Sequence, residues 1–256
     1  MSQLQFLTSP VGHQLAYRHT PAAGNSGPGV LFCCGFQSDM NGDKALAIEA
    51  LCAAQGRQFT RFDYMAHGQS GGDFAEGTIS QWRDDTLQVL DQVTTGPQLI
   101  VGSSMGGWIM LLTALARPER IHSLLGLAAA PDFTKRFVEQ ELTAEQAALL
   151  QSQGYFDVPN CYDDSGFYRM YNKLVEDGTR HNTLLEQPIA IDVPVRLLHA
   201  VDDEDVPWRV GGAIIEQLSS RDCQLQLLKT GGHRLSDPAS LALISATINT
   251  LLEQPH

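Results

Sequence analysis

The chain has 256 residues, 43% of them hydrophobic, which is enough to bury the core of one α/β domain. Its formal net charge of −12 excludes the electrostatics expected of a protein that binds nucleic acid or an anionic membrane surface. No stretch of the sequence is long and apolar enough to span a membrane.

Apolar segments and helical patterns alternate along most of the chain, which is typical of a parallel sheet covered by helices. Thr78 and Gln81 resemble a capping box that opens a helix ending near residue 93. Around that helix, the pattern predicts a hairpin of 4–7 with 14–19, strands over 29–33, 57–63, 98–103 and 121–128, and helices over 43–55 and 104–116.

The alternation stops between Pro131 and Pro194, where the sequence is helical in pattern and rich in aromatic residues. We interpret residues 131–193 as a helical cap over the carboxyl edge of the sheet, inserted into a core formed by 1–130 and 194–256. The pattern predicts that the core ends with a strand over 195–199, a helix opened by Pro207, a strand over 224–228 and a helix starting at 236–238.

The pentapeptide from Gly102 to Gly106 lies between the strand over 98–103 and the helix that follows it. Strand, sharp turn and helix are the context of the Gly-x-Ser-x-Gly nucleophile elbow, which holds its serine on a strained backbone. The two glycines leave room beside that turn. The motif therefore predicts Ser104 as a nucleophile.

A serine hydroxyl is a weak nucleophile unless a base removes its proton, so a histidine and an orienting acid are needed. In this architecture the chain order is serine, acid, histidine. His233 lies after two glycines, between the last predicted strand and the closing helix, where a loop can bring its imidazole over the elbow. We predict that His233 is the base.

Several aspartates compete for the role of the acid. Asp203 follows the strand that ends at His199 and precedes the next predicted helix, and it is the favoured candidate. Asp132 is a rival, because some hydrolases place the acid after the preceding strand. We interpret Asp202 and Asp205 as solvated loop charges.

A tetrahedral intermediate needs preorganised donors for its oxyanion. The backbone N–H groups of Met105, at the start of the elbow helix, and Phe36, in the loop after the strand over 29–33, are the predicted pair. We interpret His67 as a structural hydrogen-bonding residue and Trp108 as a core residue beneath the elbow. No metal-binding cluster is recognisable, and the sequence names no substrate-binding residue.

Cysteine usage and the N-terminal residues bear on the compartment. The five cysteines, at positions 33, 34, 52, 161 and 223, are an odd number without metal-type spacing, which favours free thiols in a reducing environment. We interpret Cys33 and Cys34 as core and packing residues. Residues 1–6 lack the charged segment and apolar core of a secretory signal, so we expect a cytoplasmic location.

Together these residues resemble the α/β-hydrolase family, and within it the group of the mitochondrial palmitoyl-protein thioesterase, also known as an acyl-glucuronide esterase. The resemblance is spread over nearly the whole chain, at 40–45, 61–64, 102–108, 196–199, 206–208 and 233–234. It implies the α/β-hydrolase fold, and it places the nucleophile, acid and base on Ser104, Asp203 and His233.

The predicted function is therefore that of a serine hydrolase acting on a small-molecule or acyl-protein ester or thioester through an acyl-enzyme, without a cofactor. Two alternatives stay open. A C–C bond hydrolase would use the same three residues. A ligand receptor with this fold would have weak turnover or none, and an intact set of catalytic residues argues against it.

Overall fold

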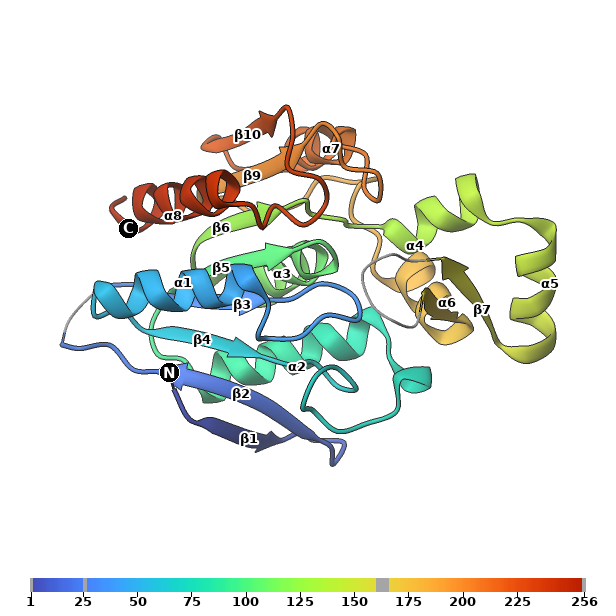
Figure 1. Ribbon diagram of the computed structural model, residues 1–256, viewed down its shortest axis with the longest axis horizontal. Coiled ribbons are helices and arrows are strands. Elements are labelled where there is room, and N and C mark those ends of the chain that lie inside the picture. Colours follow the sequence, from blue (N-terminus) through green and yellow to red (C-terminus); the bar gives the residue numbers. More distant parts are fainter. Residues whose placement is uncertain (1, 25–26, 160–165, 255–256) are drawn as a thin grey trace.

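The computed structural model describes residues 2–24, 27–159 and 166–254. A sheet of eight strands runs through the molecule in the order β1-β2-β4-β3-β5-β6-β9-β10 (Figure 1). The pairs β1–β2 and β2–β4 are antiparallel, and all pairs from β4 to β10 are parallel. The strands are β1 Leu4–Thr8, β2 Gln14–Thr20, β3 Gly29–Cys33, β4 Phe59–Phe62, β5 Gln98–Ser103, β6 Ile121–Leu127, β9 Val195–Ala200 and β10 Cys223–Leu228.

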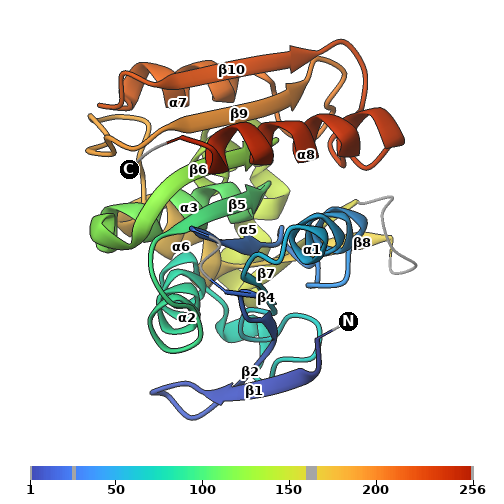
Figure 2. The ribbon, with the colours of Figure 1, turned by 90° about the vertical axis from the view of Figure 1, so that its left-hand side faces the viewer.

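Helices cover both faces of this sheet. α1 and α8 lie side by side on one face, whereas α2 and α3 lie together on the other, and α7 packs on β9 and β10 (Figure 2). The strands β3, β5, β6 and β9 are buried along their whole length, as expected for parallel strands covered on both sides. The helices are α1 Asp43–Ala54, α2 Ile79–Gln92, α3 Met105–Ala116, α7 Arg209–Gln217 and α8 Pro238–Leu252.

Apart from two short 3₁₀ turns, Phe74–Glu76 and Pro118–Arg120, the remaining elements lie between β6 and β9 in the sequence and outside the eight-stranded sheet. In Figure 1 they project beyond the carboxyl ends of the central strands, at the right of the view. They are α4 Phe133–Arg136, a π-helical turn Phe137–Glu141, α5 Ala144–Gln153, the antiparallel pair β7 Tyr155–Pro159 and β8 Phe167–Tyr171, and α6 Asn172–His181. Treating residues 131–193 as a separate cap remains our proposal.

The predicted fold class is confirmed, and two local expectations need correction. The helix expected to open at Pro207 begins at Arg209, because Pro207 and Trp208 form a turn whose carbonyls accept from Val210 and Gly211. The cap region is not purely helical, since β7 and β8 pair within it. Cys33, Cys34, Cys52 and Cys223 are free thiols, whereas Cys161 lies outside the described residues.

Candidate active site

Ser104 stands at the sharp turn between β5 and α3. Its backbone has φ +55° and ψ −121°, a conformation that is strained for a residue other than glycine. A Cβ at Gly102 would collide with the Gly106 carbonyl, and a Cβ at Gly106 would collide with the Cys33 carbonyl. The two glycines therefore allow the strand and the helix to approach closely enough to form the turn.

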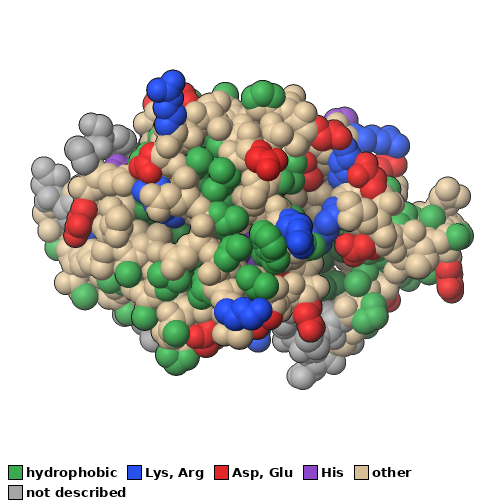
Figure 3. Space-filling model, turned by 90° about the horizontal axis from the view of Figure 1, so that it is seen from above, with side chains coloured by type: hydrophobic (Ala, Val, Ile, Leu, Met, Phe, Trp, Pro, Cys, Tyr) green, Lys and Arg blue, Asp and Glu red, His purple; other side chains and the backbone are tan. Residues whose placement is uncertain are grey.

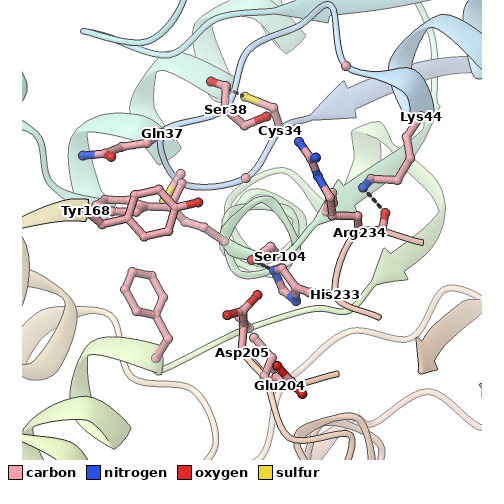
Figure 4. Close-up of a pocket in the computed structure, with 18 of the residues that line it drawn as sticks. Cys34, Gln37, Ser38, Lys44, Ser104, Tyr168, Glu204, Asp205, His233 and Arg234 are labelled. Carbon is pink, nitrogen blue, oxygen red and sulfur yellow. Dashed lines mark hydrogen bonds between the residues drawn. The ribbon is translucent and has the colours of Figure 1, made fainter. Parts of the chain in front are cut away.

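The structure brings Ser104, His233 and Asp203 into one hydrogen-bonded chain. Ser104 Oγ lies 2.9 Å from His233 Nε2, and His233 Nδ1 lies 2.9 Å from Asp203 Oδ2. Figure 4 shows the serine and the imidazole pointing toward one another at the floor of a pocket. With Asp203 ionised, Nδ1 carries the proton and Nε2 is left to accept the proton of the serine hydroxyl.

The Asp203 side chain is fully buried and surrounded by donors. Its Oδ1 accepts the backbone N–H groups of Asp205, at 3.0 Å, and Val206, at 2.9 Å. Burial alone raises the pKa of Asp203, but its contacts with His199 and His233 outweigh burial and hold that pKa well below its usual range. The carboxylate is therefore ionised at neutral pH.

The rival acid Asp132 makes different contacts. Its carboxylate accepts the backbone N–H groups of Leu184 and Leu185 at 2.8–3.0 Å. Burial raises the pKa of Asp132 above its usual value. This aspartate connects the start of α4 to the chain that leads into β9, while the hydrogen bond to His233 is made by Asp203.

The other two loop aspartates have minor places in the site. Asp202 is exposed and accepts the N–H of Gly232, next to His233. Asp205 is exposed too, and its carboxylate, together with atoms of Asp203 and His233, forms a group within 4.8 Å. Since two members of that group are hydrogen-bonded to each other, we interpret it as part of the serine–histidine–aspartate arrangement rather than as a metal site.

The loop after β3 passes directly beside the elbow. A Cβ at Gly35 would lie 3.4 Å from the Ser104 Cβ. The next N–H along the loop belongs to Phe36, and Met105 is the first residue of α3, where backbone N–H groups have no partner within the helix. One amide proposed for the oxyanion therefore follows Ser104 in the chain, and the other lies in the loop that passes beside it.

His67 shapes that loop from the buried side. Its Nε2 accepts the N–H of Gln37, at 3.2 Å, and its Nδ1 donates to the Met65 carbonyl, at 3.1 Å. Gln37 has a positive φ of +50°. Burial lowers the pKa of His67 to about 4, so the ring is neutral and Nε2 remains an acceptor. The interpretation of His67 as a structural hydrogen-bonding residue agrees with these contacts.

A pocket of about 810 Å³ opens above Ser104, within the size range of small-molecule sites. Its wall combines the loop after β3 with the elements between β6 and β9, and Phe36 packs edge-on against Phe74 and Tyr168. The apolar residues of 131–193 that line the pocket are Phe133, Phe137, Val158, Pro159 and Met170, together with the ring of Tyr168.

Three basic residues, Lys44, Arg136 and Arg234, line the same pocket. Lys44, in the first turn of α1, donates a hydrogen bond to the carbonyl of Arg234, the residue after His233 (Figure 4). Burial, followed by the nearby Arg234 guanidinium, lowers the pKa of Lys44 to about 8. The contact fastens the loop that carries His233 to the start of α1.

His199 and Lys44 contact the site although no site role was predicted for them from the sequence. His199 lies near the end of a buried strand, four residues before Asp203, and a polar side chain at that position was an available signal. For Lys44 no such signal existed, because its partner Arg234 is 190 positions away in the chain.

On the face drawn in Figure 3, charged side chains of one sign do not gather into a single patch. Basic side chains there are interspersed with acidic and hydrophobic ones. Among the helices of the described residues, none has the length and apolarity needed to cross a membrane.

Comparison with known proteins places the chain in a family. Residues 29–154 match the family described as Hydrolase_4, serine aminopeptidase S33. The mitochondrial palmitoyl-protein thioesterase ABHD10 of Mus musculus is 38% identical over 255 residues, which cover 99% of this chain and 84% of that protein. The human protein of the same name is 36% identical over 254 residues, covering 99% and 81%.

Solved structures agree. Mouse ABHD10 superposes with a TM-score of 0.90 at 38% identity, covering 98% of this chain and 99% of that one. The crystal structure of a hydrolase from Agrobacterium vitis S4 gives a TM-score of 0.94 at 33% identity, covering 99% of this chain and 100% of that one. The chain belongs to the α/β-hydrolase family. Within this α/β-hydrolase family it groups with the ABHD10 thioesterases, as the sequence motifs indicated.

The expected cytoplasmic location is contradicted by the same relatives, which are named as mitochondrial proteins. The expectation used free thiols and the character of residues 1–6. Free thiols are compatible with more than one reducing compartment, and the α/β-hydrolase fold does not indicate the compartment in which a protein is found. We withdraw that expectation.

Proposed function

We propose that the protein is a serine hydrolase that cleaves carboxylic esters or thioesters through an acyl-enzyme on Ser104. The single observation that carries this proposal is the unbroken chain from Ser104 through His233 to the ionised Asp203, with both links at 2.9 Å. The ABHD10 relatives are named palmitoyl-protein thioesterases, which supports an acyl thioester as one substrate class.

In the proposed reaction, Ser104 Oγ attacks the acyl carbon while its proton passes to His233 Nε2. The buried carboxylate of Asp203 holds the imidazole in the required tautomer and stabilises the imidazolium that forms. The N–H groups of Phe36 and Met105 bind the oxyanion of the tetrahedral intermediate. Collapse of the intermediate expels an alcohol or thiol, which takes the proton from His233.

Water then completes the cycle. His233 removes a proton from a water molecule as it attacks the acyl carbon, and the second tetrahedral intermediate releases the acid and returns the proton to Ser104 Oγ. We propose that the acyl chain lies against the apolar wall contributed by 131–193, which includes Phe133, Phe137 and Met170.

The test combines labelling and turnover. We expect a fluorophosphonate to label the parent protein on Ser104 and to leave Ser104→Ala unlabelled, because only an activated serine reacts. A matched series of acyl esters and acyl thioesters, from acetyl to hexadecanoyl, should show turnover that the same variant abolishes. An unlabelled parent without turnover would contradict the proposal and favour the alternative function, that of a ligand receptor. A labelled parent that cleaves only C–C substrates would favour the C–C hydrolase.

A further inference from the structure

Asp203 faces a second histidine besides His233. His199, the fifth residue of β9, places Nε2 3.1 Å from Asp203 Oδ2 and 2.9 Å from the carbonyl oxygen of Val206. The same Oδ2 receives the His233 Nδ1–H at 2.9 Å. One carboxylate oxygen therefore lies between two imidazole rings.

The partners of His199 fix its tautomer. A carbonyl oxygen and an ionised carboxylate can only accept, so Nε2 of His199 must carry a proton. The His199 side chain is 2% exposed and the Asp203 side chain is not exposed at all, so solvent does not supply an alternative donor. His199 is also absent from the pocket lining, and it therefore contacts the site through Asp203.

We propose that His199 is a positioning residue that orients Asp203 and, by sharing its negative charge, sets the basicity of His233. The inference rests on the proposed function. The N–H of His199, shared between the Val206 carbonyl at 2.9 Å and Asp203 Oδ2 at 3.1 Å, spreads the charge of the carboxylate. Without that donor, Oδ2 attracts a proton more strongly and stabilises the His233 imidazolium more, so the pKa of His233 rises.

Other charged groups face this cluster and must stay constant in any test. The loop after β9 contributes acidic groups, and the loop before α8, the helix α4 and the start of α1 contribute basic ones. These groups are Asp202, Glu204, Asp205, Arg234, Arg136 and Lys44.

The experiment compares four variants with the parent protein. His199→Leu removes the donor while filling the space. His199→Asn is a second variant that loses the contact with Asp203. The amide nitrogen of asparagine corresponds in position to Nδ1 of histidine, and the side chain is too short to reach Asp203. His199→Gln can place an amide N–H at the Nε2 position and should restore the contact. His122→Leu is the matched control, since His122 is a buried histidine near the start of β6, at the end of the sheet opposite the site.

Two readouts are measured for each protein. The first is the acid limb of kcat/KM against pH on an acetyl ester, and the second is the pKa of His233 from the proton NMR signal of its Nδ1–H, which needs no turnover. We expect His199→Leu and His199→Asn to raise both by about one pH unit and to lower kcat about tenfold. His199→Gln and His122→Leu should stay near the parent.

The outcomes separate this inference from the proposed function. A folded His199→Leu or His199→Asn whose NMR pKa and acid limb match those of the parent would overturn the inference and leave His199 a packing residue. A parent that shows no Ser104-dependent turnover would overturn the proposed function, and the NMR titration would still decide whether His199 controls the basicity of His233.

Discussion

Two buried aspartates near the site differ in what their carboxylates hold. Asp203 contacts two histidines and also accepts two backbone N–H groups, whereas Asp132 accepts two backbone N–H groups and, among the described residues, no hydrogen bond from a histidine. We expect Asp203→Asn to lower kcat about 10⁴-fold, because an amide favours the wrong imidazole tautomer. Asp132→Asn should keep kcat near the parent value and cost about 1 kcal/mol of stability, since a neutral acceptor binds N–H groups less strongly. Steady-state kinetics and urea unfolding of both variants check this.

The two variants control for each other. Both remove one buried negative charge, and Asn tolerates the left-handed backbone that Asp132 adopts, with φ +56°. An active Asp203→Asn beside an inactive Asp132→Asn would reverse the assignment of the acid.

At the residue scale, chain order and local context were enough to predict Ser104, Asp203 and His233 as neighbours. The elbow is a local motif, and the ends of parallel strands meet at one edge of the sheet, so the loops after β9 and β10 had to lie near it. The polar residue at His199 was an available signal, but its contact with Asp203 was not predictable from it. It depends on a side-chain rotamer and a tautomer, which only tertiary packing fixes.

The loop between β3 and α1 depends on His67 as an acceptor. In the folded protein burial lowers the pKa of His67 to about 4 from 6.5, so between these values the unfolded chain binds more protons. His67 therefore stabilises less as the pH falls from about 6.5 to 4, by up to about 3 kcal/mol. Asp63, whose pKa burial raises to about 6, acts in the opposite direction over much of this range.

A variant isolates the contribution of His67. His67→Gln keeps an acceptor for the Gln37 N–H and removes the titrating ring, while Asp63 remains. We expect the unfolding free energy of the parent to fall more steeply than that of His67→Gln between pH 6.5 and 4. The difference between the two slopes against pH should correspond to the uptake of about one proton on unfolding. Urea unfolding at several pH values measures it. Parallel curves of unfolding free energy against pH for the two proteins would show that protonation of His67 does not destabilise the folded protein.

At the element scale, the sequence predicted the sheet and its flanking helices well because buried strands and amphipathic helices have clear periods. It failed where tertiary contacts decide. Within the described residues, β7 and β8 are short and form a two-stranded sheet of their own, so an aromatic-rich stretch without strict alternation appeared helical. Pro207 suits a first helical turn, yet Val206 and its carbonyl are held by Asp203 and His199, which delays α7 by two residues.

At the scale of the whole molecule, the elements between β6 and β9 are fastened to the core at a few polar contacts. Asp177 on α6 accepts the Ser80 N–H at 2.9 Å and the Ser80 hydroxyl at 2.7 Å, in the first turn of α2. A carboxylate there also complements the dipole of α2. Asn182 donates to the same carboxylate at 2.9 Å, and its carbonyl accepts from Trp108.

We expect Asp177→Ala to loosen this attachment, because the lost contacts to a charged group are together worth about 1.5–3 kcal/mol. If the wall contributed by 131–193 contacts the acyl chain, kcat/KM for a hexadecanoyl ester should then fall about tenfold while that for an acetyl ester changes little. Glu176→Ala is the matched control, since Glu176 is the exposed neighbour on α6. Equal losses on both esters, or losses in Glu176→Ala as well, would show that the wall does not depend on this attachment.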